Sequence, residues 1–136
     1  MNLTTFHPPL EISKNIRNFD ICLTVYLQME ESFIYYIESS IKENWDRPAL
    51  TDYHGINCNY KDVARKIEKL HILFEHAGIK KGDKIALCGR NSTNWGIAFL
   101  ATLTYGAVVV PILNEFKPDN IHNIVNHSEA RLLFVG

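Results

Sequence analysis

The loop Gly89-Arg90-Asn91-Ser92 is the first stretch whose residue types could do chemistry, because it joins an apolar run to an expected helix. Backbone N–H groups at a helix N-terminus can bind an anion such as a phosphate group. The loop contains neither the G-x-G-x-x-G pattern of dinucleotide sites nor the G-x-x-x-x-G-K-[ST] phosphate loop. Serine is a favoured residue at a helix N-cap. We therefore interpret Ser92 as a cap and not as a ligand group.

Lysines and histidines supply two further candidate sites, one for anions and one for metal ions. Lys80 and Lys81 lie beside a glycine but precede a strand-like run, whereas a phosphate loop follows a strand, so we interpret them as part of a solvated turn. Two histidine pairs have a spacing of five residues, which turns a helix through about 500°, so the paired side chains diverge by roughly 140° and cannot share a metal. These pairs are His71 with His76 and His122 with His127.

Nucleophilic catalysis has no recognisable setting in the sequence. Ser92, Ser128 and Cys88 lack a G-x-S-x-G or comparable context, and no pair of carboxylates is placed for acid–base work. The cysteines are odd in number and form no Cys-x-x-Cys, which argues against a disulfide framework and against a zinc knuckle. We expect Cys22, Cys58 and Cys88 to be free, mostly buried thiols in a reducing compartment. The sequence thus predicts no catalytic, cofactor-binding or metal-ligating residue.

The composition is that of an ordinary globular protein. A length of 136 residues favours one domain, and 46% hydrophobic with 21% charged residues excludes intrinsic disorder. A formal net charge of -1 gives no field that would gather nucleic acid. The closest approach to a membrane span, residues 21–27, is much shorter than the ~20 apolar residues required, and it lacks the small-residue cleavage site of a signal peptide. We expect a cytoplasmic protein without a nucleic-acid partner.

The candidate loop lies within residues 82–136, which are predicted to form strand, helix, strand, helix and strand. Continuous apolar runs indicate strands that are buried on both faces, and such strands form a parallel sheet covered by helices on each side. Pro118 fits the first turn of the second helix, whose core face is expected to carry Ile121, Ile124 and Val125. The predicted strands are residues 84–88, 108–112 and 131–135, and the first, mostly buried helix is residues 93–105.

An amphipathic helix, a hairpin and a second helix precede the predicted sheet. Residues 32–44 carry apolar side chains at helical spacing, and strands at 49–53 and 56–60 are expected to join through a turn at His54-Gly55. The helix of residues 59–77 has a capping-box pattern at its start and an i,i+4 ion pair between Asp62 and Lys66. Its predicted core face comprises Val63, Ile67, Leu70, Leu73, Phe74 and Ala77. The fold class is therefore α/β: a parallel sheet flanked by helices, with a small N-terminal β-hairpin.

The two ends of the chain suggest a division into two regions. Residues 1–28 differ from the rest in the pattern of their residue types. Met29-Glu30-Glu31-Ser32 has the composition expected at the start of a soluble protein. Residues 1–28 are either an extension that is not native or an ordinary N-terminal arm. The last predicted strand is followed directly by Gly136, although ligands of open α/β sheets bind at loops beyond such strands. We expect residues 29–136 to be the N-terminal portion of a larger, truncated domain.

Five motifs follow one another over about a hundred residues: Arg47-Pro48-Ala49-Leu50, Asn59-Tyr60-Lys61-Asp62-Val63-Ala64, and the stretches 78–92, 105–112 and 128–134. Their order and spacing resemble the N-terminal part of the adenylate-forming acyl-CoA synthetases, the AMP-binding family. This family also includes luciferases and the adenylation domains of peptide synthetases. Within it, the chain resembles bacterial long-chain fatty acid–CoA ligases.

The resemblance implies a two-step reaction in a longer protein, here called the parent. ATP and a fatty acid give an acyl-adenylate and pyrophosphate in the presence of Mg²⁺, and the acyl group then passes to the thiol of coenzyme A. The family's phosphate loop, nucleotide-binding motifs and catalytic lysine lie beyond Gly136, so no functional residue is carried over to this chain. We expect residues 1–136 alone to be inactive, to hold no cofactor, and to self-associate through uncovered apolar surface. For the parent we expect a peripheral membrane contact.

Two other functions fit the same residues. The first is an amino-acid-activating adenylation domain, which belongs to the same family. The second is a stand-alone α/β interaction module with no enzymatic activity. A gene that continues beyond codon 136 into a Ser/Thr/Gly-rich loop with a lysine indicates a ligase, whereas a stop codon there favours the module.

Overall fold

The computed structural model describes residues 32–136. The predicted boundary between residues 28 and 29, the apolar run 21–27 and Cys22 all lie outside the described residues, so the two-region division stays a prediction.

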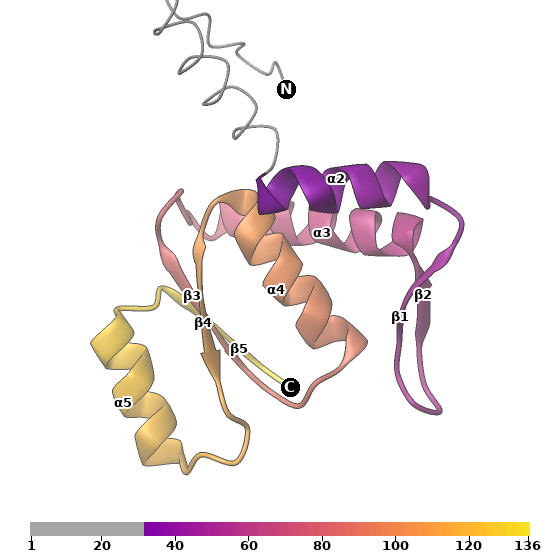
Figure 1. The fold of residues 1–136 in the computed structure, drawn as a ribbon. Coiled ribbons are helices and arrows are strands. Elements are labelled where there is room, and N and C mark those ends of the chain that lie inside the picture. Colours follow the sequence, from indigo (N-terminus) through magenta and orange to yellow (C-terminus); the bar gives the residue numbers. More distant parts are fainter. Residues whose placement is uncertain (1–31) are drawn as a thin grey trace, which may run out of the picture. The chain divides into compact units, whose positions relative to one another are not determined.

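The centre of the fold is a three-stranded parallel sheet with the order β4-β3-β5 (Figure 1). The central strand β3 pairs on both sides, so that Ile85 lies opposite Val109 on β4 and opposite Leu132 on β5. Each strand is linked to the next by a helix, as parallel pairing requires. The α/β class predicted from the sequence is confirmed. The elements are β3 (Lys84–Cys88), α4 (Thr93–Tyr105), β4 (Val108–Ile112), α5 (Pro118–Ser128) and β5 (Leu132–Val135).

Helices cover the two faces of the sheet separately. On one face, α4 and α3 (Tyr60–His76) enclose a core that includes Phe74, Ile85, Leu87 and Ile97. On the other face, α5 packs its apolar side against Ala86, Cys88 and Ile112. The predicted core face of α5 is confirmed, since the side chains that pack there are Ile121, Ile124 and Val125.

Only the central strand is buried along most of its length. Ile85, Ala86 and Leu87 are at most 1% exposed, whereas Val108 on β4 is 48% exposed and Val135 on β5 is 76% exposed. The expectation that all three apolar runs are buried on both faces is therefore wrong for β4 and β5. Both are edge strands within the described residues, and an edge strand leaves one side without a neighbour.

A two-stranded antiparallel hairpin and two helices precede the sheet, as predicted. Strand β1 (Pro48–Thr51) pairs with β2 (Asn57–Asn59), and His54 in the connecting turn adopts a left-handed conformation with φ 53°. Helix α2 (Phe33–Glu43) lies alongside α3 (Figure 1). Helix α3 therefore follows the hairpin directly, and its first residue is Tyr60.

Helix α3 begins and ends as the sequence predicts, but its buried face is narrower. The backbone N–H of Asn59 donates to Asp62 Oδ2 at 3.1 Å, and Gly78 beyond the helix has φ 70°. Phe74 is fully buried, whereas Leu73 is 47% exposed and Ala77 is also exposed. Leu73 lies about 90° around the helix from the centre of the stripe that packs against the core, and Ala77 is already the C-cap.

The predicted ion pair between Asp62 and Lys66 does not form. Asp62 Oδ1 lies 4.0 Å from Arg65 Nη1, one position earlier on the helix. Lys66 points instead toward the hairpin, where its Nζ lies 3.6 Å from Cys58 Sγ. Both i,i+3 and i,i+4 neighbours are within reach on a helix surface, so spacing alone did not decide between the two partners.

An aspartate from the hairpin fixes the hairpin to the start of α4. Asp52 Oδ1 accepts a hydrogen bond of 2.6 Å from the backbone N–H of Thr93, 41 residues further along the chain. Ser92 Oγ accepts from the N–H of Trp95 at 3.2 Å, which confirms the predicted N-cap. A carboxylate at this end of a helix also interacts favourably with the helix dipole.

We predict that Phe74→Ala lowers the free energy of unfolding by about 3–5 kcal/mol, because it removes a fully buried ring that contacts Tyr105 and Phe134. Leu73→Ala, on the neighbouring but half-exposed residue, is the matched control and should change it by only about 0.5 kcal/mol. Urea denaturation followed by circular dichroism measures both. Equal losses for the two variants would contradict the observed orientation of α3.

We also predict that Asp52→Ala lowers the free energy of unfolding by about 0.5–2 kcal/mol, because Thr93 loses the acceptor for its N–H group. Asp46→Ala is the control, since Asp46 forms an exposed ion pair with Lys61 that is worth at most about 1 kcal/mol. Thermal unfolding of the three proteins is the measurement. A larger loss for the Asp46 variant would contradict the role assigned to Asp52.

Candidate functional site

A cleft of about 530 Å³ lies at the carboxyl end of the sheet. The loop after β3 and the first turn of α4 form one wall, and the end of β4 with the loop that follows it forms the other. The wall after β3 consists of Gly89, Arg90, Asn91 and Trp95, and the wall after β4 consists of Pro111, Ile112, Leu113, Asn114 and Glu115.

The topology explains why the cleft lies there. The chain leaves β3 toward α4 on one face of the sheet, whereas it leaves β4 toward α5 on the opposite face. Two neighbouring loops that diverge to opposite faces open a crevice beyond the strand ends, and open α/β sheets bind ligands at such switch points. The cleft is therefore the candidate site, and the predicted loop Gly89-Arg90-Asn91-Ser92 contributes three residues to it.

The side chains of the cleft are polar but balanced in charge. Arg90 brings a positive charge and Glu115 a negative one, while Asn91 and Asn114 offer amide groups. With its amide oriented to donate, Asn114 reaches Glu115 Oε1 at 2.9 Å. Trp95 adds an aromatic wall that stacks on Phe99 at a centroid distance of 5.4 Å. This arrangement can bind a polar, partly planar molecule, but it holds no acid–base pair.

The N-terminus of α4 does not present a free anion site. Its capping positions are filled from within, by the Ser92 hydroxyl and by the Asp52 carboxylate. An incoming phosphate would meet the negative charge of Asp52 at the very N–H group that it needs. Sequence reasoning missed Asp52, because no local pattern links a hairpin residue to a helix that begins 41 positions later.

The lysine-rich turn is remote from the cleft. The stretch 79–83 precedes β3 and therefore lies at the amino end of the sheet, opposite to the cleft. Asp83 holds this turn, since its Oδ2 accepts from the backbone N–H of Lys80 at 2.8 Å and from Arg131 Nη1 at 3.1 Å. The stem of Lys81 packs close to Gly106, which has φ 83°. The predicted turn is confirmed, and it precedes β3, whereas a phosphate loop follows a strand.

His71, His76 and His122 each have their own hydrogen-bonding partners. His71 Nε2 lies 3.0 Å from the carbonyl oxygen of Ala101 and 3.1 Å from Thr104 Oγ1. Because the Thr104 hydroxyl donates to the carbonyl oxygen of Leu100, both neighbours accept, and Nε2 must carry the proton. His76 Nδ1 faces the carbonyl oxygen of Ile72, and His122 Nε2 lies 3.3 Å from Asn126 Nδ2. Between residues 32 and 136, no three His, Cys, Asp or Glu side chains gather to hold a metal.

The hydroxyls of Ser92 and Ser128 take part in hydrogen bonds of the fold, and the two described thiols are buried. Ser128 Oγ donates to the carbonyl oxygen of Val125 at 3.1 Å, within its own helix. Cys58 and Cys88 are free thiols that are 3% and 6% exposed. The prediction of buried free thiols is confirmed for these two. No helix of the described residues is long and apolar enough to cross a bilayer.

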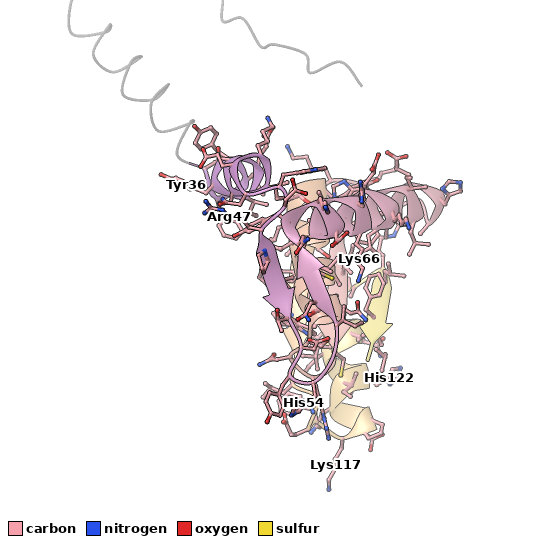
Figure 2. The ribbon with its side chains drawn as sticks, turned by 90° about the vertical axis from the view of Figure 1, so that its right-hand side faces the viewer. Tyr36, Arg47, His54, Lys66, Lys117 and His122 are labelled. Atoms are coloured by element: carbon pink, nitrogen blue, oxygen red, sulfur yellow. The ribbon has the colours of Figure 1, made fainter. Side chains whose placement is uncertain are left out.

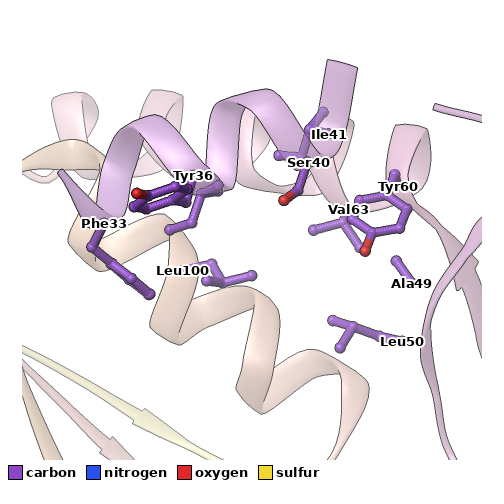
Figure 3. Close-up of a pocket in the computed structure, with 10 residues that line it drawn as sticks. Phe33, Tyr36, Ser40, Ile41, Ala49, Leu50, Tyr60, Val63 and Leu100 are labelled. Atoms are coloured by element: carbon purple, nitrogen blue, oxygen red, sulfur yellow. The ribbon is translucent and has the colours of Figure 1, made fainter. Parts of the chain in front are cut away.

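A second hollow of about 310 Å³ lies under α2 (Figure 3). Phe33, Tyr36 and Ile41 of α2 face Leu50 of β1 and Leu100 of α4 across it. Its wall is almost entirely apolar, with the Ser40 hydroxyl as one of its few polar groups. No acidic or basic side chain lines it.

Comparison with known proteins identifies the family. The family model described as AMP-binding enzyme matches residues 37–136. YdaB of Bacillus subtilis, whose name assigns it provisionally to the acyl-CoA ligases, is 35% identical over 77 residues, which cover 57% of this chain and 15% of YdaB. Surfactin synthase subunit 2 of the same organism is 30% identical over 96 residues, which cover 71% of this chain and 3% of that protein.

A solved structure supports the fold independently. The N-terminal subdomain of NpsA from Klebsiella oxytoca superposes with a TM-score of 0.68 at 23% identity, covering 76% of this chain and 27% of that chain. The chain spans 15% or less of the length of the two curated relatives above. Because the family model matches 100 consecutive residues that include the hairpin, both covered faces of the sheet and the cleft, the chain belongs to the AMP-binding enzyme family.

Proposed function

We propose that the parent is an ATP-dependent fatty acid–CoA ligase that acts through an acyl-adenylate. The family match over residues 37–136 carries this proposal. Among the relatives above, identity is higher to YdaB, at 35%, than to surfactin synthase subunit 2, at 30%, which favours a CoA ligase over an amino-acid-activating domain. The substrates would be a fatty acid, ATP with Mg²⁺, and coenzyme A. We place the parent in the cytoplasm, with a peripheral membrane contact where it collects its apolar substrate.

The described residues do not themselves form a binding site for a nucleoside triphosphate. The α4 N-terminus is already capped by Ser92 and Asp52, and the cleft has one arginine balanced by one glutamate. No cluster of acidic side chains between residues 32 and 136 suits Mg²⁺. We therefore assign residues 32–136 the role of a frame that presents the loops after β3 and β4, and we derive no catalytic step from them.

We further propose that residues 1–136 self-associate when produced alone. Supporting this, β5 exposes Leu133 (38%) and Val135 (76%), β4 exposes Val108 (48%), and neither strand has a partner on its outer side within the described residues. Unpaired apolar edge strands recruit further strands.

We predict no carboxylate-dependent ATP–pyrophosphate exchange for residues 1–136, because they offer no phosphate site. The full open reading frame containing these residues should catalyse the exchange with fatty acids and, after addition of coenzyme A, form the fatty acyl thioester. Exchange with amino acids and no thioester would assign the parent to the adenylation domains instead. ATP–pyrophosphate exchange catalysed by residues 1–136 alone would refute the proposal that residues 32–136 act only as a frame.

We also predict that light scattering shows residues 1–136 above the monomer mass, increasingly so with concentration. Val135→Lys places a charge on the exposed edge and should shift the distribution toward the monomer. Leu73→Lys, on the half-exposed side of α3, serves as the control and should leave the distribution unchanged. A monomer at all concentrations, or an equal response to both substitutions, would count against association through the sheet edge.

A further inference from the structure

A thiol and a primary amine that the proposed function does not use lie in contact between the hairpin and α3. Lys66 Nζ is 3.6 Å from Cys58 Sγ. Cys58 points inward from β2 and is 3% exposed, within the main apolar core. Figure 2 shows Lys66 beside the hairpin, below α3. The contact brings a soft nucleophile and a primary amine together at the edge of the core.

The pairing is not a by-product of a surface ion pair. Asp62, the carboxylate one turn earlier, faces Arg65, and no carboxylate among residues 32–136 pairs with Lys66. Within residues 32–136 the sulfur of Cys58 is the hydrogen-bonding partner of the Lys66 ammonium group. The four-carbon stem of a lysine is flexible, so Nζ can close the remaining distance to the sulfur.

We propose that Cys58 and Lys66 form a redox-dependent modification site, at which a peroxide oxidant links Sγ to Nζ through a reversible covalent S–N bond. The inference concerns the chain's own chemistry and is independent of the proposed ligase function. It rests on the contact between Lys66 Nζ and Cys58 Sγ and on the burial of the sulfur.

The reaction balances in two steps. Hydrogen peroxide oxidises the Cys58 thiol by two electrons to a sulfenic acid and is itself reduced to water. The neutral Lys66 amine, after releasing its proton to solvent, attacks the sulfur. The S–O bond then breaks, and the departing hydroxide takes one proton from nitrogen and leaves as water. The net change is Cys58–SH + Lys66–NH₂ + H₂O₂ → Cys58–S–NH–Lys66 + 2 H₂O. Sulfenic acids are known to condense with nitrogen in this way, and an added thiol reverses the bond.

Burial of Cys58 favours the internal product. Hydrogen peroxide is much smaller than a thiol reagent, so a sulfur that is 3% exposed can admit the oxidant and still be shielded from thiols of other molecules, whereas the Lys66 amine is already within 3.6 Å. The bridge would tie β2 to α3 across eight residues and would therefore restrain the hairpin against the helix on which it packs.

Cys88 provides an internal comparison. It is also a free thiol, 6% exposed, and it packs with Ala86 and Ile112 under α5. No lysine nitrogen is hydrogen-bonded to its sulfur within the part of the chain that the structure describes. Burial alone is thus shared by the two cysteines, and the neighbouring amine is what distinguishes Cys58.

The test is mass spectrometry of residues 1–136 after treatment with hydrogen peroxide, with and without subsequent dithiothreitol. A Cys22→Ser, Cys88→Ala background leaves Cys58 as the sole thiol, so that no internal disulfide can form. We expect a monomer that has lost the mass of two hydrogen atoms and regains it when dithiothreitol is added to the denatured protein, in which the sulfur is no longer shielded. After trypsin digestion, the peptide containing Cys58 should be joined to the one containing Lys66. The same linked peptide is expected from the unsubstituted chain, which covers the case of a background that folds poorly.

Two matched variants decide the outcome. Lys66→Arg keeps the charge but removes the primary amine, and it should abolish the linked peptide, as should Cys58→Ser. Oxidation of Cys58 to a sulfinic acid with Lys66 unmodified would overturn the proposal, and so would a Cys58 that stays reduced. A product that retains an added oxygen atom, or a linked peptide that persists in the Lys66→Arg variant, would overturn the direct S–N bond.

Discussion

The burial of β3 between two strands and two helical layers is the constraint on which the rest of the structure depends. Ile85 and Leu87 point to the face covered by α3 and α4, and Ala86 points to the face covered by α5. Because β3 is hydrogen-bonded on both sides, its register fixes the positions of β4 and β5 at once. A polar side chain at any of these three positions would be buried without a partner, which makes the strand's composition a condition of the whole fold.

The same constraint creates the cleft. Since successive helices must cover opposite faces of β3, the loops that leave β3 and β4 have to diverge. The place of the cleft is thus set by topology, whereas its chemical character is set by the few side chains that line it. This separation is consistent with similarity to relatives named as differently as YdaB and a surfactin synthase subunit, since one fold can carry different sites.

Periodicity predicted the elements and their order, because each strand and helix is dictated by residues close in sequence. Strand β3, helix α4 and strand β4 were predicted with the bounds observed, helped by a cap at Ser92 and a left-handed Gly106. The errors concern contacts between elements. Leu73 lies just outside the stripe that α4 covers, and Asp52 reaches Thr93 across 41 residues. Neither fact has a local signal, since each depends on how separate elements pack.

In a structural frame, polar groups form hydrogen bonds with one another, whereas a reaction site keeps some of them free for a substrate. At the start of α4, a carboxylate and a hydroxyl occupy the donors that an anionic ligand would require. At the amino end of the sheet, Asp83 accepts hydrogen bonds from both the lysine-rich turn and Arg131. Polar groups that already form such hydrogen bonds stabilise the fold but are unavailable to a substrate. A ligand would have to break the existing hydrogen bond before it could form its own. Within residues 32–136, the side chains of Arg90 and Asn91 in the cleft form no such hydrogen bond, which separates the cleft from these two satisfied ends of the sheet.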